Sequence, residues 1–394
     1  MRVVAPEAVP AAVVAGDPCY DRLIASRPFR AAYRRRLGIT DNRMVVLVSS
    51  TWSASSLWGS WPELIERLGA ELPADTYQLM AVLHPNVVQG HGGYQVRAWL
   101  AGALRAGLIL IPPEHGWQAG LIAADMVIGD HGSVTAYASA LGKAVLLGAF
   151  PDDEVAPGTA VHELGRLADR LDRETPLRPQ IEKAWNEHQP FRYAEVARLA
   201  SSSPGEAADR IRTLFYNVLG RSEPCGEALT PPYSGTGLAP AERPRLTAAL
   251  VHCVTDTAAQ LITLERFAAE PRSPGTARSG VRSHLAVRHT HPGRRLRERA
   301  EVLTAPADEI SDVDTWLNAS LDGKPHLLAA VTSERFAILR HRRFGDIEAE
   351  ADGDIGGEII ASAMLAWLDT KPVPDQPITV AAGLRRVRLR VRRR

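Results

Sequence analysis

The run Met126-Val-Ile-Gly-Asp130-His-Gly-Ser133 has the residue types and spacing of an anion-binding turn. A strand-like apolar segment stops at Gly129, a tight Asp-His-Gly turn follows, and residues 133–141 contain no glycine or proline, which is typical of a helix. A helix that begins at this point directs backbone N–H groups and the positive end of its dipole at one spot, which suits a diphosphate. The alternative is an ordinary strand-to-helix turn in which Asp130 or Ser133 is only a cap.

The elements that must position this turn alternate between strands and helices over residues 12–150. Six apolar runs of strand length are Ala12–Ala15, Met44–Val48, Tyr77–Leu83, Leu108–Ile111, Met126–Ile128 and Ala144–Leu147. Helix-like spacing occurs in Trp61–Leu68, Tyr94–Ala106 and His115–Ala124. The apolar runs are continuous, which is expected of strands that are covered on both faces. The sequence therefore predicts a Rossmann-like, doubly wound parallel α/β sheet.

In such a sheet, ligands bind at the carboxyl ends of the strands, near the point where the strand order reverses. The segments that follow four of the predicted strands are Ser49–Ser53, His84–Asn86, Pro112–Trp117 and Gly129–Ser133. Hydroxyls, imidazoles, an aromatic ring and a helix N-terminus thus meet at one edge. This set favours a polyanion with an attached ring over a metal, and we expect neither a metal nor a cofactor. The alternatives are a polar loop for Ser49–Ser53, a hydrogen-bonded turn for His84, and packing for Trp117.

Several common motifs are absent from the sequence. It contains no G-x-x-x-x-G-K-[ST] phosphate loop, no G-x-G-x-x-G dinucleotide fingerprint and no G-x-S-x-G nucleophile elbow. The predicted phosphate turn must therefore be of another type.

Three segments together resemble the C-terminal, donor-nucleotide half of GT-B transferases. They are Gly16-Asp17-Pro18-Cys-Tyr-Asp21, Leu83-His84-Pro85-Asn86 and Ala123-Ala-Asp125-Met-Val-Ile-Gly-Asp130-His-Gly-Ser133. The pattern is most similar to CDP-glycerol glycerophosphotransferases and to non-hydrolysing UDP-N-acetylglucosamine epimerases, and it covers about residues 12–220.

The resemblance implies a site for a CDP- or UDP-linked donor whose glycosyl or glycerophosphoryl group is transferred. Ser133 and Val134 would cap the diphosphate, and His84 would lie near the same phosphates. The Ser49–Ser53 loop would approach the transferred group, and the Pro112–Trp117 loop would lie by the base or ribose. The implied donor-site residues are Ser49, Thr51, His84, Trp117, Asp130, Gly132, Ser133 and Val134. No catalytic residue is assigned, and an epimerase would need carboxylates that we cannot place.

A GT-B enzyme has two halves, and the resemblance begins only some fifteen residues after Met1. The acceptor half is therefore expected to be missing from this chain. It would come from a longer reading frame or a partner chain, or the chain would be a binding remnant. Catalysis needs both halves, because holding donor and acceptor together supplies much of the rate.

Beyond residue 150 the chain changes character twice. Residues 151–221 are expected to be a helical extension, with Val161–Leu171, Phe191–Leu199 and Glu206–Leu219 as its clearest helices, and residues 222–245 a Pro/Gly-rich linker. Residues 246–394 should form a β-rich α+β domain of unknown role, with a hairpin turn at Thr332–Arg335 and a helix at Gly357–Leu368. Its expected strands are Leu250–Val254, Gln260–Leu264, His284–His289, His326–Thr332, Arg335–His341, Ile378–Val380 and Val387–Val391.

Composition limits the class of protein. The chain has 394 residues, with 46 Lys+Arg against 45 Asp+Glu, so no overall field favours nucleic acid or a membrane. Three dispersed cysteines, no signal-like N-terminus and no long apolar run predict a cytoplasmic protein. His289-Thr-His291 lacks a third ligand and is interpreted as surface strand rather than a metal site.

The local exception in charge is the arginine-rich C-terminus, residues 385–394. We expect a strand with one solvated basic face, and no nucleic-acid binding, because no aromatic residues are interleaved. The leading interpretation is thus a GT-B-like transferase half. The alternative is a non-catalytic nucleotide-sugar-binding or scaffold module with this basic strand as its contact.

Overall fold

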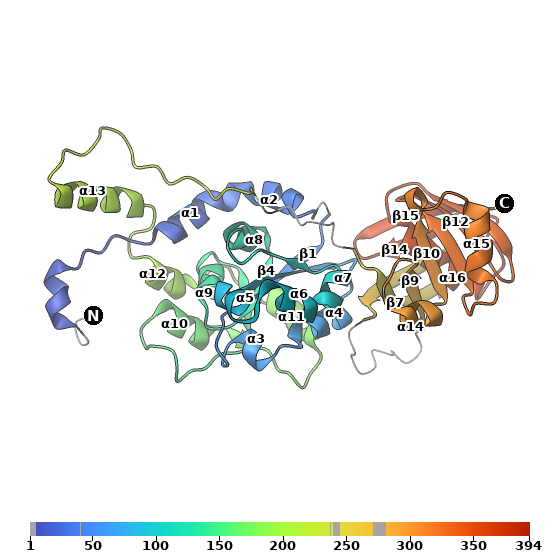
Figure 1. Cartoon of the computed structure of the whole chain (residues 1–394), viewed down its shortest axis with the longest axis horizontal. Helices are drawn as coiled ribbons and strands as arrows, with labels where there is room; N and C mark the ends of the chain where they lie inside the picture. Colours follow the sequence, from blue (N-terminus) through green and yellow to red (C-terminus); the bar gives the residue numbers. More distant parts are fainter. Residues whose placement is uncertain (1–4, 40, 237, 239–244, 271–280) are drawn as a thin grey trace.

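The computed structural model describes residues 5–39, 41–236, 238, 245–270 and 281–394. Two β structures organise the chain, an open sheet within residues 44–170 and a closed barrel within residues 248–393. They lie side by side along the long axis of the molecule (Figure 1).

The open sheet has six parallel strands in the order β3-β2-β1-β4-β5-β6. The strands are β1 (Met44–Ser50), β2 (Tyr77–Leu83), β3 (Ile109–Leu110), β4 (Met126–Gly129), β5 (Ala144–Leu147) and β6 (Asp169–Arg170). Because the chain runs outward from β1 to β3 and then returns to β4 on the other side of β1, the strand order reverses between β1 and β4. This confirms the predicted doubly wound parallel sheet.

One predicted strand is wrong. Ala12–Ala15 is not a strand, and the side chains of Val13 and Val14 are exposed to solvent. Both edges of the central strand β1 are already paired, with β2 and β4, so this short apolar run has no partner there.

Helices cover both faces of the sheet. Val45 and Leu47 of β1 belong to one core, with α1, α2, α8, α9, α10 and α12, whereas Val46 and Val48 belong to the other, with α3 to α7 and α11. This two-sided burial explains the continuous apolar runs. The helices up to residue 140 are α1 (Pro18–Ser26), α2 (Arg30–Arg36), α3 (Leu57–Ser60), α4 (Leu64–Glu71), α5 (Pro85–His91), α6 (Gly93–Trp99), α7 (Ala101–Arg105), α8 (Trp117–Ala123) and α9 (Ser133–Ala140), with 3-10 turns at Pro6–Ala11 and Arg27–Phe29.

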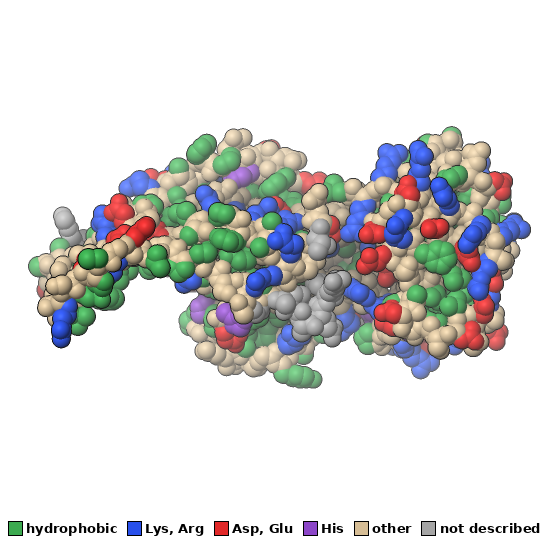
Figure 2. Space-filling view, turned by 90° about the horizontal axis from the view of Figure 1, so that it is seen from above, with side chains coloured by type: hydrophobic (Ala, Val, Ile, Leu, Met, Phe, Trp, Pro, Cys, Tyr) green, Lys and Arg blue, Asp and Glu red, His purple; other side chains and the backbone are tan. Residues whose placement is uncertain are grey.

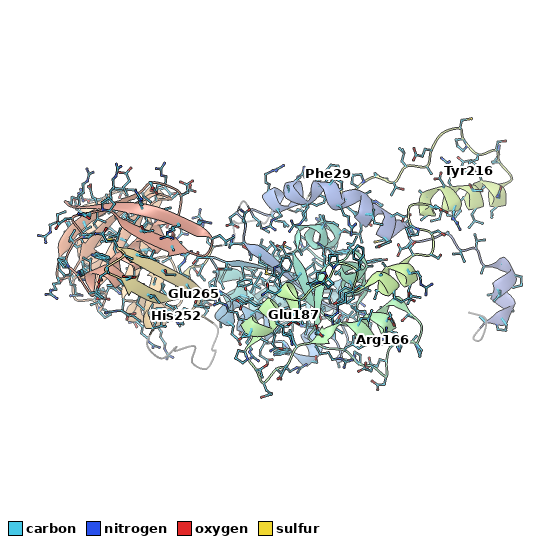
Figure 3. All side chains as sticks on the ribbon, turned by 180° about the vertical axis from the view of Figure 1, so that it is seen from behind. Phe29, Arg166, Glu187, Tyr216, His252 and Glu265 are labelled. Atoms are coloured by element: carbon cyan, nitrogen blue, oxygen red, sulfur yellow. The ribbon has the colours of Figure 1, made fainter. Side chains whose placement is uncertain are left out.

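Residues 151–221 are mostly helical, as expected. They form α10 (Ala160–Leu167), α11 (Leu177–Asn186), α12 (Ala194–Ala200) and α13 (Ala207–Leu219). The predicted helix Val161–Leu171 ends early, because Asp169–Arg170 pairs with β5 as strand β6. Helix α13 buries only Ala207, and it projects away from the sheet with Tyr216 on it (Figures 1 and 3). The described part of residues 222–245 contains no helix or strand. The division of the chain into a Rossmann-like domain, a helical extension, a linker and an accessory domain stays a prediction.

Residues 248–393 form a closed barrel of mixed parallel and antiparallel strands, in the order β10-β11-β12-β13-β15-β14-β8-β7-β9. The strands are β7 (Ala248–Asp256), β8 (Leu261–Ala268), β9 (Arg282–Arg288), β10 (Val302–Pro306), β11 (Leu328–Thr332), β12 (Phe336–His341), β13 (Gly345–Ala351), β14 (Ile378–Ala382) and β15 (Arg385–Arg393). The predicted hairpin is confirmed, since β11 and β12 pair antiparallel across residues 333–335. Strands β10 and β13 were not predicted, nor were α14 (Arg294–Arg299), a 3-10 turn at Ala307–Glu309 and α15 (Val313–Leu321).

Helix α16 (Gly357–Leu368) lies inside this barrel and has the bounds that the sequence predicts. Nearly all of its residues are buried, and it packs against β7, β8, β9, β10, β11, β12 and β14. The segment is apolar on all sides, which is the pattern of a helix enclosed by other elements.

The arginine-rich C-terminus is strand β15, which pairs with β13 and β14. Val387 and Leu389 are buried, whereas the arginines that alternate with them, Arg386, Arg388 and Arg390, are exposed, so the expected basic outer face is confirmed. Figure 2 shows basic and acidic side chains interspersed on the barrel. In the part of the chain that the structure describes, no helix has the length and apolarity needed to cross a bilayer.

Candidate functional site

The turn after β4 is held by the carboxylate of Asp130, which is completely buried. Its Oδ2 accepts hydrogen bonds from the Thr51 backbone N–H at 2.8 Å, the Thr51 hydroxyl at 2.9 Å and the Leu57 N–H at 2.9 Å. The Ser50 hydroxyl donates to the same oxygen at 3.2 Å, and the Gly132 N–H donates to Oδ1 at 3.0 Å. Both oxygens of Asp130 are therefore occupied by the protein, and the residue fastens the loop after β1 to the turn before α9.

Helix α9 begins at Ser133, with Gly132 as a cap that provides no side-chain hydrogen bond. The first backbone hydrogen bond to this cap is that of Ala136 N–H to the Gly132 carbonyl at 3.1 Å. The N–H groups of Ser133 and Val134 have no acceptor within the described residues, as is general for the first turn of a helix. Ser133 is exposed and Val134 half-buried, so these two donors lie at the surface of the carboxyl edge.

Thr51 and Trp52, which follow β1, and His84, which follows β2 on the far side of β1 from β4, extend this corner. The methyl of Thr51 lies so close to Gly132 that a Cβ on this glycine would come within 2.7 Å of it. The rings of Trp52 and His84 pack with their centroids 6.4 Å apart, and the His84 N–H donates to the Ser50 carbonyl at 3.0 Å. The His84 Nδ1 accepts from the Asn86 N–H at 3.1 Å, so this imidazole also caps α5. His84 and the start of α9 therefore belong to one continuous group of residues.

Trp117, at the end of the third predicted loop, contacts α9 itself. Its ring stacks on that of Tyr137 at a centroid distance of 6.1 Å, one turn along α9 from Ser133. The Tyr137 hydroxyl donates to Asp17 at 2.6 Å, and burial together with this bond raises the pKa of Tyr137 well above its ordinary value. Asp17 also caps α1, by accepting from the N–H groups of Cys19 and Tyr20.

The structure brings most of the predicted site residues together. Thr51, Asp130 and Gly132 are in direct contact, and Ser133 and Val134 follow in α9. His84 packs on Trp52 next to Thr51, and Trp117 packs on Tyr137 of α9. Ser49 is different, because it lies buried within β1, opposite Val82 of β2. The roles of all these residues toward a ligand stay predictions. No cluster of metal-ligating side chains occurs among the described residues.

Sequence reasoning did not single out His131, which lies in the turn between Asp130 and Gly132. Its Nδ1 is buried and has no hydrogen-bond partner within the described residues. Burying a polar nitrogen without a partner costs free energy, so this atom is a candidate for contact with a ligand at the start of α9. Its position within the turn was the available signal.

A comparison with protein-family models finds no match, and neither does a comparison with curated proteins. Among solved structures, the chain is similar to the wall teichoic acid polymerase TagF, at 14% identity and a TM-score of 0.38, over 53% of this chain and 52% of that chain. A glycosyltransferase from Rickettsia africae is 12% identical, with a TM-score of 0.33, over 52% and 55% of the two chains. UDP-GlcNAc 2-epimerase from Neisseria meningitidis is 16% identical, with a TM-score of 0.32, over 53% and 55%.

The chain thus spans about half the length of the solved structures it matches. They include a glycosyltransferase and a UDP-GlcNAc epimerase, classes that the sequence motifs also resemble. At these identities and TM-scores the likeness carries no conclusion about activity.

Proposed function

We propose that the open-sheet half of this chain binds a nucleoside-diphosphate-linked donor at the start of α9, as part of a glycosyl or glycerophosphoryl transferase. The observation that carries the proposal is the pair of N–H groups of Ser133 and Val134, which have no acceptor in the described structure. They lie at the carboxyl edge beside the reversal of strand order between β1 and β4, where doubly wound sheets bind nucleotides.

The Asp130 network supports a phosphate role because it fixes the donors before a ligand arrives. Thr51 and Gly132 donate to opposite oxygens of one buried carboxylate. Moving the loop after β1 away from the start of α9 would therefore break buried hydrogen bonds. Prearranged N–H dipoles stabilise a departing diphosphate, since they need no reorganisation when charge develops. His84, and His131 through its buried Nδ1, would supply further donors.

The base or ribose would lie toward Trp117, and the transferred group toward the Ser49–Ser53 loop. Trp117 already stacks on Tyr137, and an aromatic ring held in this way can pack against a nucleobase. We propose a CDP- or UDP-linked donor, in keeping with the families that the motifs resemble.

The acceptor half would come from a partner chain or from further sequence, and α13 offers a surface for it. Phe215, Val218 and Leu219 of this projecting helix are all more than half exposed. Apolar side chains grouped in this way mark a surface that another protein unit covers. Binding of the donor without any turnover, when the acceptor half is present, would instead favour the non-catalytic nucleotide-sugar-binding or scaffold module.

The decisive experiment is calorimetric titration of the full chain with CDP and UDP, using Ser133→Pro as the test variant. Proline is favoured at the first residue of a helix, and the φ of −80° and ψ of 159° at Gly132 suit a residue that precedes proline. The substitution therefore removes the Ser133 N–H while α9 is kept.

We expect wild-type binding in the micromolar range and a loss of about 10- to 150-fold in Ser133→Pro, the value of one hydrogen bond to a charged group. Ser133→Ala keeps the N–H, removes only the hydroxyl, and should lose less. If neither CDP nor UDP binds to the wild type, or if Ser133→Pro binds them equally well, the proposed donor site is wrong.

A further inference from the structure

A second candidate site lies at the opposite edge of the open sheet, where that sheet meets the barrel. A cavity of about 550 Å³ separates the two, which is within the range of ligand-binding pockets. On the sheet side it is bounded by the amino ends of β1 and β2, by α4, and by the segment between α7 and β3. The α9 site is instead at the carboxyl ends of the strands, so the two are separate. Figure 3 shows the barrel beside the sheet, with Glu265 on the barrel side of the junction.

The barrel side of this cavity is the barrel mouth at which α16 begins. The carboxyl ends of β8, β9, β10 and β11 contribute Arg266, Arg288, Pro306 and Thr332 to the lining. Strands β9, β10 and β11 are mutually parallel neighbours, and the carboxyl ends of parallel strands are where ligands usually bind.

The start of α16 supplies donors to the same mouth. Gly356, the residue before the helix, has a φ of +95°, provides no side-chain cap, and meets only the Glu358 carboxylate where a Cβ would stand. Within the described residues, the N–H groups of Gly357 and Glu358 have no backbone acceptor. The positive end of the helix dipole therefore faces the cavity without a capping side chain.

Arginine side chains are fixed around this helix start. Arg266 forms two hydrogen bonds with Asp75 across the junction, at 2.7 and 2.9 Å. Arg288 has a side chain only 14% exposed and is paired with Glu309, but its Nε is buried and without a partner within the described residues. The Arg288 side chain lines the cavity, and a buried guanidinium N–H that lacks an acceptor is costly. A shift of this side chain that brought its Nε to an oxyanion in the cavity would therefore be favourable.

The carboxylates of the lining limit how much negative charge a ligand can carry. Glu66 and Glu358 are half-buried, whereas Asp308 and Glu334 are exposed, and none of the four has an ion pair among the described residues. A polyanion such as a nucleoside diphosphate would be repelled by them. On the sheet side, the wall is largely apolar, with Ile65, Leu72, Leu79 and Leu108.

We propose that this junction cavity binds a small organic molecule with one oxyanionic group, a carboxylate or a phosphate monoester, on an apolar body. The oxyanion would bind at the start of α16 beside Arg288, and the apolar body would pack against α4 and β2. Arg385, which is joined to Asp41 at 3.0 Å, closes the other side. The ligand would contact both halves of the chain, independently of any donor at α9.

The test is calorimetric titration of the full chain with phenyl phosphate, 3-phenylpropionate and the neutral benzyl alcohol. We expect one of the two anionic probes to bind at least about tenfold more tightly than benzyl alcohol, because charge-assisted hydrogen bonds form only with an anion. Tighter binding of phenyl phosphate identifies a phosphate monoester as the ligand class, and tighter binding of 3-phenylpropionate a carboxylic acid.

Arg288→Gln should weaken binding of the preferred probe at least about tenfold. Arg385→Gln, at a side chain that is 43% exposed, should weaken that binding less. The matched control is Arg393→Gln, an exposed arginine of the same strand as Arg385 but outside the lining. Ser133→Pro should leave this binding unchanged, so failure at α9 and failure here can be told apart. The proposal is overturned if neither anionic probe saturates the wild type, or if both cavity variants bind as the wild type does.

Discussion

Removal of the Asp130 carboxylate should destabilise the open-sheet half and release the proposed donor turn. In Asp130→Ala the backbone N–H groups of Thr51, Leu57 and Gly132 lose their acceptor in a buried position. At about 1 kcal/mol for each buried N–H left without a partner, the loss is about 3 kcal/mol. The single proton of the Ser50 hydroxyl can donate instead to the Thr51 carbonyl, at 3.0 Å, so this group adds little to the loss.

Asp130→Asn separates hydrogen bonding from charge. Both carboxylate oxygens accept bonds, so the amide nitrogen of asparagine must face a donor in either orientation. We therefore expect the unfolding free energy of Asp130→Asn to lie between that of the wild type and that of Asp130→Ala. Urea denaturation followed by tryptophan fluorescence measures it, with Asp153→Ala as the exposed control.

The same variants report on function. Because Asp130 fastens Thr51 to the start of α9, Asp130→Ala should also weaken CDP or UDP binding under conditions in which the variant is folded. An unfolding free energy within about 0.5 kcal/mol of the wild type, the usual effect of a surface change, would refute the reasoning that this carboxylate organises the turn.

Two further predictions concern buried charges. Burial lowers the pKa of Lys143 from 10.5 to about 8. Below pH 8 the lysine is charged in both the folded and the unfolded protein, so the full cost of burying the charge applies. Between pH 8 and 10.5 only the unfolded protein keeps the proton, so the free energy of unfolding rises with pH. The unfolding free energy of Lys143→Met should thus exceed that of the wild type by up to about 3 kcal/mol at pH 7, less the value of the lost hydrogen bond to the Ala124 carbonyl. Urea titrations should show this difference shrinking between pH 8 and 10.5. A difference that stays constant over that range would contradict the prediction. Asp75→Ala leaves the guanidinium of Arg266 unpaired at the junction, where the side chains of Asp75 and Arg266 are only 10% and 16% exposed. The substitution should lower the free energy of unfolding by about 3–5 kcal/mol. The surface change Glu298→Ala is the control, and equal melting temperatures for the two variants would show that the ion pair is dispensable.

The strands of the open sheet could be predicted well because burial on both faces leaves a strong local signal. Tyr77–Leu83 and Ala144–Leu147 have the predicted bounds, as does α16, which is apolar on every side. The failures have physical reasons as well. Ala12–Ala15 is apolar but has no strand to pair with, and Asp169–Arg170 is a strand through its pairing with β5 alone.

In the barrel, the strands that were missed owe their conformation to distant partners. Strand β13 buries Ile347, Ala349 and Ala351 in alternation, but two of these three are alanines and the residues between them are acidic, so the period-2 pattern is weak. Its partners are β12 and β15, the second of which lies about 40 residues away along the chain. Barrel closure depends on many such pairings and cannot be inferred from local pattern.

The candidate site shows the same division between local and distant information. The strand, turn and helix from Met126 to Ala140 were visible in the sequence, because each depends on neighbouring residues. The inward direction of Asp130 was not, since its partners lie some 80 residues earlier in the chain. Sequence pattern thus located the turn, while the contacts show which of its groups are left for a ligand.

The two proposed sites lie at opposite ends of the same two strands. β1 follows Arg43 of the junction cavity and ends at Ser50, beside the Asp130 network, while β2 follows Asp75 of the cavity and ends before His84. Both strands are packed on both faces, so neither end can move without disturbing a buried core. Substitutions that are far apart and share no partner are additive. The effects of Ser133→Pro and Arg288→Gln should accordingly stay confined to their own ligands, which makes the two proposals separable within one chain.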